Sequence, residues 1–244
     1  SSTDNSIKEI NEDITIINER TQTLSQEISG IKTETEEAKK ILDNLQKEYD
    51  QLRITVYYKK NPTAFLTFDD GPCSRTTNRL LDGLKERNVK ATFFLVGENA
   101  ESNEKVVKRM YEEGHLIGNH TYSHIKLDEC NISSAVGEIN KTNEIIKSIT
   151  GEDVKYIRPP YGAYSDKLLS HVNMTPVLWS IDPDDWATTD TAYVVKSVVY
   201  KVKNGDIILL HDIYDSSVEA ALEIIDRLSS KGFVFVTVDQ LMLD

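Results

Sequence analysis

The chain has 244 residues, 39% of them hydrophobic, which is enough for one domain of ordinary size and an appendage. Its formal net charge of -12 at pH 7 argues against nucleic acid or anionic lipid as a partner, because an acidic protein and a phosphate-rich partner repel each other. No run of about eighteen apolar residues occurs and the sequence starts at SSTDN rather than Met, so neither a membrane helix nor a signal peptide is visible.

Residues 1–55 follow a seven-residue repeat. They contain no proline, one glycine and a single aromatic residue, Tyr49. The inner positions of seven successive heptads are Ile7, Ile14, Thr21, Ile28, Thr35, Leu42 and Tyr49, alternating with Ile10, Ile17, Leu24, Ile31, Ala38, Leu45 and Leu52. A period of about 3.5 residues kept over this length predicts a left-handed coiled coil, on the order of 70 Å long.

The charges that flank the inner positions favour a parallel homodimer. In a parallel pair, each g side chain faces the e side chain five residues later on the partner. These pairs are opposite in sign for Glu27 with Lys32, Glu34 with Lys39, and Glu48 with Arg53. Thr21 and Thr35 are polar inner positions that lower stability and help to fix the register. The alternative is a single long helix that folds back on the rest of the chain, and isoleucine at both inner positions also permits other stoichiometries.

The heptad pattern ends at Thr55, residues 56–61 are predicted to be a linker, and residues 62–244 alternate strand and helix signals. The predicted strands lie at residues 64–68, 91–96, 115–118, 156–158, 176–180, 206–210 and 233–238. The predicted helices lie at residues 76–87, 104–113, 133–150, 165–171, 192–201 and 218–231. This alternation predicts a mostly parallel sheet, and about seven units suit a closed or nearly closed α/β barrel. Chemistry in such barrels lies at the carboxyl ends of the strands.

The first predicted strand ends in TFDDG, on Asp69 and Asp70. Adjacent strand residues point to opposite sides, so this pair does not suit the two facing carboxylates of a glycosidase. A division of labour is more natural, in which one acid binds a metal ion and the other acts as a base. HTYSH at residues 120–124 supports such an ion, because histidines four apart on a helical turn share one face. One carboxylate and two imidazoles leave positions open for water and substrate.

Taken alone, the histidine pair is more readily explained by a surface or capping role than by metal binding. Three further strand ends make metal binding the better explanation. Arg158 opens RPPYG, Asp185 and Trp186 lie in SIDPDDW, and His211 and Asp212 end IILLHD. Each motif follows an apolar strand. Four strand ends that bring charged or aromatic groups to one mouth are hard to explain by packing alone.

In this order and spacing, TFDDG, HTYSH, RPPYG, DPDDW and LLHD resemble the five motifs of the NodB-like polysaccharide deacetylases, carbohydrate esterase family 4. The resemblance covers residues 62–244 and is greatest to the peptidoglycan N-acetylglucosamine deacetylases. It implies a distorted (β/α) barrel that removes acetyl groups from N-acetylated sugars with a divalent metal, most often zinc. The coiled-coil segment lies outside the resemblance.

The resemblance also implies a role for each motif residue. Asp70, His120 and His124 resemble the metal ligands of the family, and Asp69 resembles its general base. Arg158 is similar to the residue that orients this base.

The remaining motif residues resemble the acid and the substrate pocket of the family. His211 is similar to the general acid, and Asp185 to the carboxylate that tunes it. Trp186 and Leu209 resemble the wall of the acetyl pocket, and the Tyr161 backbone N–H resembles an oxyanion donor. The sequence departs from the family only after the fifth motif, in HDIYDSSV, a loop that bears on specificity.

The other polar residues have more ordinary explanations. His115 is predicted to be structural, whereas Asp212 is either structural or a partner of a metal ligand or of the base-orienting arginine. Asp182 is predicted to be a cap or turn former, although its position near the mouth would also let it contact sugar. Cys73 and Cys130 are too few for a disulfide framework and are expected to be free thiols rather than a pair.

The sequence therefore predicts a metal-dependent hydrolase that removes N-acetyl groups from N-acetylglucosamine in a cell-envelope polysaccharide, with peptidoglycan as the leading substrate. The alternatives are an O-acetylxylan or chitin-type deacetylase, and an inactive glycan-binding coiled-coil protein. We expect an extracellular or cell-envelope location. The coiled coil would then act as a dimeriser or spacer that holds the barrel away from a membrane anchor outside this sequence.

Overall fold

The structure is a computed structural model that describes the backbone of residues 2–243 and the side chains of residues 12–50, 52 and 60–240. The chain divides into two compact units, one up to residue 57 and one from residue 58 onward. None of the described helices is both long enough and apolar enough to cross a bilayer.

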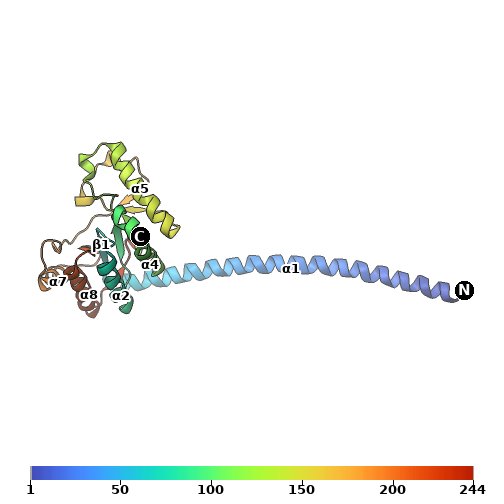
Figure 1. Ribbon diagram of the computed structural model, residues 1–244. Helices are drawn as coiled ribbons and strands as arrows, with labels where there is room; N and C mark the ends of the chain where they lie inside the picture. Colours follow the sequence, from blue (N-terminus) through green and yellow to red (C-terminus); the bar gives the residue numbers. More distant parts are fainter. Residues whose placement is uncertain (1, 244) are drawn as a thin grey trace. The chain divides into compact units, whose positions relative to one another are not determined.

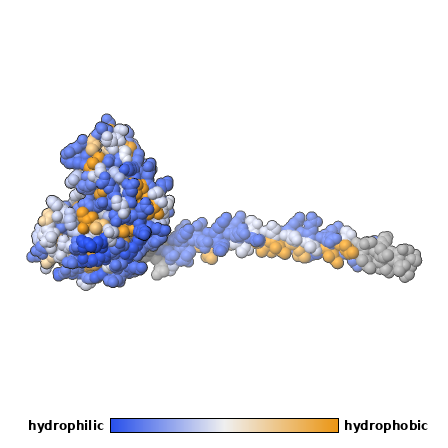
Figure 2. Space-filling model, in the orientation of Figure 1, coloured by the Kyte–Doolittle hydropathy of each residue, from blue (hydrophilic) through white to orange (hydrophobic). Residues whose placement is uncertain are grey.

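One uninterrupted helix, α1 (Ser2–Lys60), spans the first unit and ends three residues beyond it, as expected from the long-helix prediction (Figure 1). It continues through most of the predicted linker and ends just before Pro62, because the residue that precedes a proline is disfavoured in the α conformation. Between residues 12 and 50, most of its apolar residues lie along one side (Figure 2). Ile17, Ile28 and Leu42 are 62%, 65% and 65% exposed, so a single copy of α1 leaves this side in water.

The second unit contains a parallel sheet of seven strands, as predicted. They are β1 (Thr63–Asp69), β2 (Thr92–Leu95), β3 (Leu116–Asn119), β4 (Tyr156–Ile157), β5 (Thr175–Pro176), β6 (Asp206–His211) and β7 (Val234–Val236). Their order is β5-β4-β3-β2-β1-β6, and β7 pairs with the start of β1. Beyond β5, Ile181 exchanges two backbone hydrogen bonds with the free edge of β6, at 3.1 and 2.9 Å. This bridge brings the two ends of the sheet together into a nearly closed, distorted barrel.

Seven helices connect the strands. They are α2 (Ser74–Glu86), α3 (Gly97–Ser102), α4 (Glu104–Glu112), α5 (Ile132–Thr150), α6 (Asp166–Leu169), α7 (Thr191–Val199) and α8 (Asp215–Ser230). Short 3-10 turns lie at η1 (Leu127–Glu129), η2 (Pro160–Gly162) and η3 (Val238–Leu243). Each predicted helix is present. The sequence missed only α3 among the α-helices, because six residues are too few to show a helical period.

Side chains of β1 alternate between two cores. Ala64, Leu66 and Phe68 pack in the larger core with apolar residues of α2, α4, α7 and α8. Phe65 belongs to a smaller core with Phe94, Val177, Val236 and Val238. Because residues two apart share a face, Thr67 and Asp69 continue the row of Phe65 toward the carboxyl end of the strand. The register pairs Asp69 with His211 of β6, so both functional groups reach the same edge of the sheet.

Candidate active site

A pocket of about 410 Å³ lies at the carboxyl ends of the strands. Its walls are Asp69, Asp70, His120, His124, Tyr161, Trp179, Asp182, Trp186, Leu209, His211 and Tyr214. Every residue that the motifs predicted is among them except Arg158 and Asp185. These two are 0% and 2% exposed and contact the pocket residues from behind.

Both acids of TFDDG face this pocket, although adjacent strand residues were expected to point apart. The strand ends at Asp69, and Asp70 has a left-handed backbone with φ of 71°. The Asn99 side chain donates a hydrogen bond of 2.7 Å to the Asp70 carbonyl and fixes this turn. At Gly71, a Cβ atom would lie 2.3 Å from a carboxylate oxygen of Asp212, so the turn requires glycine there.

His120 and His124 lie in an irregular loop, and the predicted helical turn is therefore wrong. The loop bends through left-handed backbone at Thr121 and at His124, with φ of 64° and 55°. This bend brings the two imidazole rings to 4.9 Å between centroids. A short loop with two left-handed residues thus produces the convergence that was expected from helical spacing.

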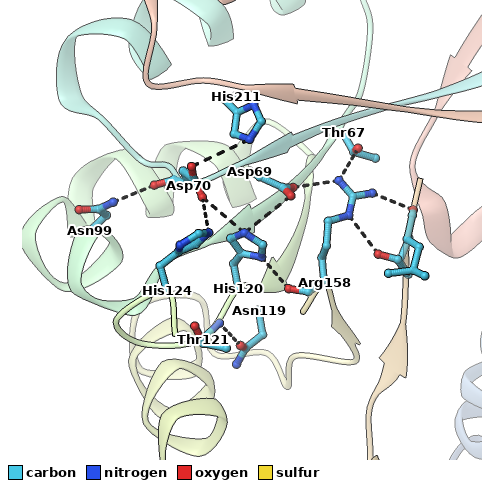
Figure 3. A network of polar contacts seen from close by, with 12 residues as sticks. Thr67, Asp69, Asp70, Asn99, Asn119, His120, Thr121, His124, Arg158 and His211 are labelled. Carbon is cyan, nitrogen blue, oxygen red and sulfur yellow. Dashed lines mark hydrogen bonds and ion pairs between the residues drawn. The ribbon is translucent and has the colours of Figure 1, made fainter. Parts of the chain in front are cut away.

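The donor atoms of Asp70, His120 and His124 fit a metal ion. One ligand atom from each lies within 4.8 Å of the others. The Nε2 atoms of His120 and His124 are 3.4 and 3.2 Å from Asp70 Oδ1 (Figure 3). This oxygen is buried and has no hydrogen-bond partner within the described part of the chain. A buried oxygen without a partner is energetically unfavourable unless a cation or a water molecule binds to it.

The tautomer of His120 also suits a ligand. Its Nδ1 lies 2.5 Å from the Arg158 carbonyl, and a carbonyl can only accept, so Nδ1 donates this hydrogen bond. In the neutral ring, the Nε2 lone pair then points toward Asp70. Burial is the largest cause that lowers the pKa of His124, and the nearby His120 adds to it, so the His124 ring favours the neutral form.

Asp69 is held by a buried arginine. Arg158 Nη1 donates to Asp69 Oδ1 at 2.9 Å and to Thr67 Oγ1 at 2.7 Å (Figure 3). Its other donors reach the carbonyls of Val177 and Leu178 at 3.0 and 3.1 Å. Removing one partner of a buried ion pair of this kind typically costs about 3–5 kcal/mol. The network therefore fixes the orientation of Asp69 and keeps it facing a positive charge.

His211 is paired with Asp185, which lies behind it. The two oxygens of Asp185 accept hydrogen bonds from the His211 backbone N–H and from its Nδ1, both at 2.8 Å. Burial by itself lowers the pKa of His211, but Asp185, with Asp69 and Asp70, outweighs it and raises this pKa to about 9. The imidazole is therefore protonated at neutral pH in the metal-free protein and has a proton to give.

Aromatic residues surround the mouth. Tyr161 has a left-handed backbone with φ of 60°, and its ring packs against His124 at 5.0 Å between centroids. On the other side, the ring of Tyr214 lies 6.5 Å from that of His211. Both tyrosines and Trp186 are exposed, so the pocket presents flat apolar faces with polar tips, which suit sugar rings.

Among the residues with more ordinary explanations, Asp182 lines the pocket, whereas His115 and Asp212 do not. His115 is buried, accepts a hydrogen bond of 3.2 Å from the Ala91 N–H, and has its pKa lowered by burial to about 4, as a structural histidine does. Asp212 accepts a hydrogen bond from the Thr77 hydroxyl and contacts neither Arg158 nor a candidate metal ligand through a hydrogen bond among the described residues. Burial raises its pKa to about 7. Both cysteines are free thiols, as predicted.

Sequence reasoning missed several residues that shape the site. Thr67 occupies the inner row of β1 two residues before Asp69, so strand alternation could have indicated it. Trp179, Asn99 and Glu138 reach the site or its loops through tertiary contacts. No local pattern in the sequence marks these three.

Comparison with known proteins agrees with this geometry. The family model described as polysaccharide deacetylase matches residues 57–177. The chain is 42% identical over 176 residues to the peptidoglycan-N-acetylmuramic acid deacetylase PdaC of Bacillus subtilis, covering 72% of this chain and 38% of that protein. It is 43% identical over 187 residues to a peptidoglycan-N-acetylglucosamine deacetylase of Bacillus cereus, covering 74% of this chain and 68% of that protein.

A solved structure is similar over the same region. The structure of peptidoglycan deacetylase PdaC from Bacillus subtilis superimposes with a TM-score of 0.73 at 41% identity, covering 74% of this chain and 90% of that chain. The chain spans less than two fifths of the full length of PdaC. With the barrel, the five motifs and these relatives in agreement, the chain belongs to the polysaccharide deacetylases of the NodB type, carbohydrate esterase family 4.

Proposed function

We propose that residues 62–244 form a metal-dependent deacetylase that hydrolyses the N-acetyl amide of N-acetylglucosamine in peptidoglycan and releases acetate. One observation supports this most strongly: a single pocket brings together an arginine-held carboxylate, an Asp-His-His cluster and a protonated histidine. The name of the Bacillus cereus relative supports the choice of sugar.

Asp70, His120 and His124 would hold the metal ion, and zinc is the favoured ion because it accepts one carboxylate and two imidazoles. When bound, such an ion lowers the pKa of water to about 7 and polarises a carbonyl group. Asp69 would accept the proton of the attacking water. Arg158 keeps the base oriented, since it binds one carboxylate oxygen and leaves the other free to face the pocket.

His211 would donate its proton to the leaving nitrogen, because an amine leaves poorly unless it is protonated. Asp185 keeps this acid charged at neutral pH. The Tyr161 backbone N–H would stabilise the oxyanion, a contribution of about 3 kcal/mol for one donor in other enzymes. Trp186 and Leu209 would form the wall against the acetyl methyl group.

Acetate release tests this proposal and its alternatives together. Zinc-loaded protein is incubated with peptidoglycan, chitin oligomers and acetylxylan, and the released acetate is measured. We expect faster release from the N-acetylated substrates, and from peptidoglycan most of all. Release from acetylxylan alone would replace the proposed activity with an O-deacetylase, and no release from any of them by metal-loaded protein would favour a glycan-binding role.

We also propose that α1 pairs with a second copy of itself as a parallel coiled coil. The exposed isoleucines and leucines of α1 would be buried by a second helix, and the opposite charges five residues apart suit a parallel partner. Such a rod would hold the deacetylase at a distance from its attachment point in the cell envelope. The peptidoglycan relatives support an envelope location.

A further inference from the structure

The loop of residues 120–124, here called the histidine loop, has a strained backbone. Thr121 and His124 are not glycine, yet they lie at φ of 64° and 55°. Threonine is β-branched and is especially uncommon in this region. Such a backbone conformation is unfavourable for these residues and persists only where the surrounding structure holds it. The convergence of His120 and His124 therefore depends on groups outside the histidine loop.

Glu138 of α5 supplies the main side-chain support. One of its oxygens, Oε2, accepts hydrogen bonds from the backbone N–H groups of Tyr122 and Ser123 at 3.1 and 2.8 Å. The Ser123 hydroxyl lies 3.0 and 3.1 Å from the two carboxylate oxygens and donates to them. Hydrogen bonds to an ionised acceptor are about twice as strong as neutral ones. All of these donors lie between the two histidines.

The histidine loop is also held by the Asn119 side chain and by backbone N–H groups of α3. Asn119 Oδ1 accepts from the Thr121 N–H at 2.7 Å (Figure 3), and its amide donates to the Ile139 carbonyl of α5 at 2.8 Å. The first N–H groups of α3, at Gly97 and Glu98, donate to the carbonyls of Thr121 and Tyr122 at 2.9 and 3.0 Å. Helix α5 thus braces the histidine loop twice, through Asn119 and through Glu138.

We propose that Glu138 is a positioning residue for the metal site. By holding the Tyr122–Ser123 backbone, it keeps the Nε2 atoms of His120 and His124 directed at Asp70 before an ion arrives. This inference rests on the proposed metal binding by those three residues. If Glu138 is removed, the loop relaxes and the form that can bind metal becomes a minor population. The apparent affinity for metal is then the affinity of that form multiplied by the fraction of molecules that adopt it.

The experiment is a zinc titration of the metal-free 244-residue chain in the presence of a competing chromophoric chelator. Groups that orient metal ligands typically contribute 10- to 100-fold to affinity, so we expect Glu138→Ala to weaken zinc binding by roughly that factor. Glu138→Gln keeps one acceptor oxygen and should lose less. Glu144→Ala is the matched control, because Glu144 is on the same helix and exposed, and it should bind zinc like the wild type.

Hydrogen exchange of the metal-free proteins gives a second readout that needs no ion. The Tyr122 and Ser123 amides should be protected in the wild type and in Glu144→Ala, and should lose protection in Glu138→Ala while α5 remains protected. Unchanged zinc affinity in Glu138→Ala, or an equal loss in Glu144→Ala, would overturn the inference. A wild type that binds no zinc would instead remove the proposed metal site on which the inference rests.

Discussion

Asp185 sets the protonation of His211 at the scale of single residues. Its charge is the main reason that the pKa of His211 reaches about 9 despite burial. In Asp185→Asn the shape remains but the charge is gone, so we expect the His211 pKa to fall from about 9 toward the ordinary value near 6.5. NMR titration of the metal-free protein measures this directly.

The sign of this change has a consequence for catalysis. A raised pKa keeps the acid form present up to about pH 9, and a lower pKa removes it as the pH rises through neutrality. The alkaline limb of the pH–rate profile should therefore move to lower pH in Asp185→Asn. If the His211 pKa remains near 9 in the variant, Asp185 does not tune the acid.

The proposed site residues could be named from the sequence because they belong to short motifs at strand ends. Their geometry could not. Left-handed backbone at Asp70, Thr121 and His124 brings the side chains of Asp70, His120 and His124 to the pocket, and none of the three left-handed positions is a glycine that would have signalled it. Glu138 lies outside the motifs, on the helix that follows the histidine loop, so only the folded chain reveals its contact with that loop.

At the scale of elements, the hydrophobic pattern located six of the seven strands and every α-helix except α3, whereas the strand predicted at residues 176–180 overlaps β5 only at Pro176. The strands of this barrel are short and buried, and helices separate them regularly, so composition marks them well. The end of β5 was less predictable. Only Thr175–Pro176 pair as a strand, and the closing bridge to β6 comes from Ile181, after an irregular stretch. Barrel closure depends on this long-range pairing, which has no local signal.

Two glycines in different elements should respond in opposite ways to alanine. At Gly118 in β3, a Cβ would lie 2.5 Å from the Phe94 ring, which packs against the Arg158 guanidinium at 4.3 Å. Overpacking of this kind costs about 1–3 kcal/mol, so Gly118→Ala should lower the free energy of unfolding. Gly137 in α5 has open space around it, and Gly137→Ala should raise that free energy by up to about 1 kcal/mol.

Denaturant unfolding of the two variants beside the wild type checks this pair. If Gly118→Ala and Gly137→Ala changed the free energy of unfolding by the same amount, the packing argument would be contradicted. A general effect of alanine would be the same at both positions. A stable Gly118→Ala protein would show that β3 and Phe94 can separate without loss, which the buried Arg158 network does not allow.

For the whole molecule, the central prediction is pairing of α1. Ile31 is an inner heptad residue and is 63% exposed in a single chain, whereas Thr33, two residues later, is an outer residue. An aspartate at either position is exposed in a monomer, so the two changes differ only if a partner covers Ile31. Sedimentation analysis should show a dimer for the wild type and for Thr33→Asp, and a shift toward monomer for Ile31→Asp.

Turnover on soluble oligomers should remain unchanged in Ile31→Asp, because the proposed site lies entirely within the second unit. A monomeric wild type would refute the coiled-coil assignment and leave α1 as a single-chain spacer. A dimer that survives Ile31→Asp would mean that the contact lies elsewhere.

Acetate release from peptidoglycan, with zinc content measured on the same samples, tests the proposed chemistry most directly. We expect the wild type to bind one zinc ion and release acetate, and Asp69→Asn to keep its zinc while losing at least about 100-fold in rate, because the base is gone and the ligands are not. Acetate release by zinc-bound Asp69→Asn at the wild-type rate, or none from zinc-bound wild type, would contradict the account.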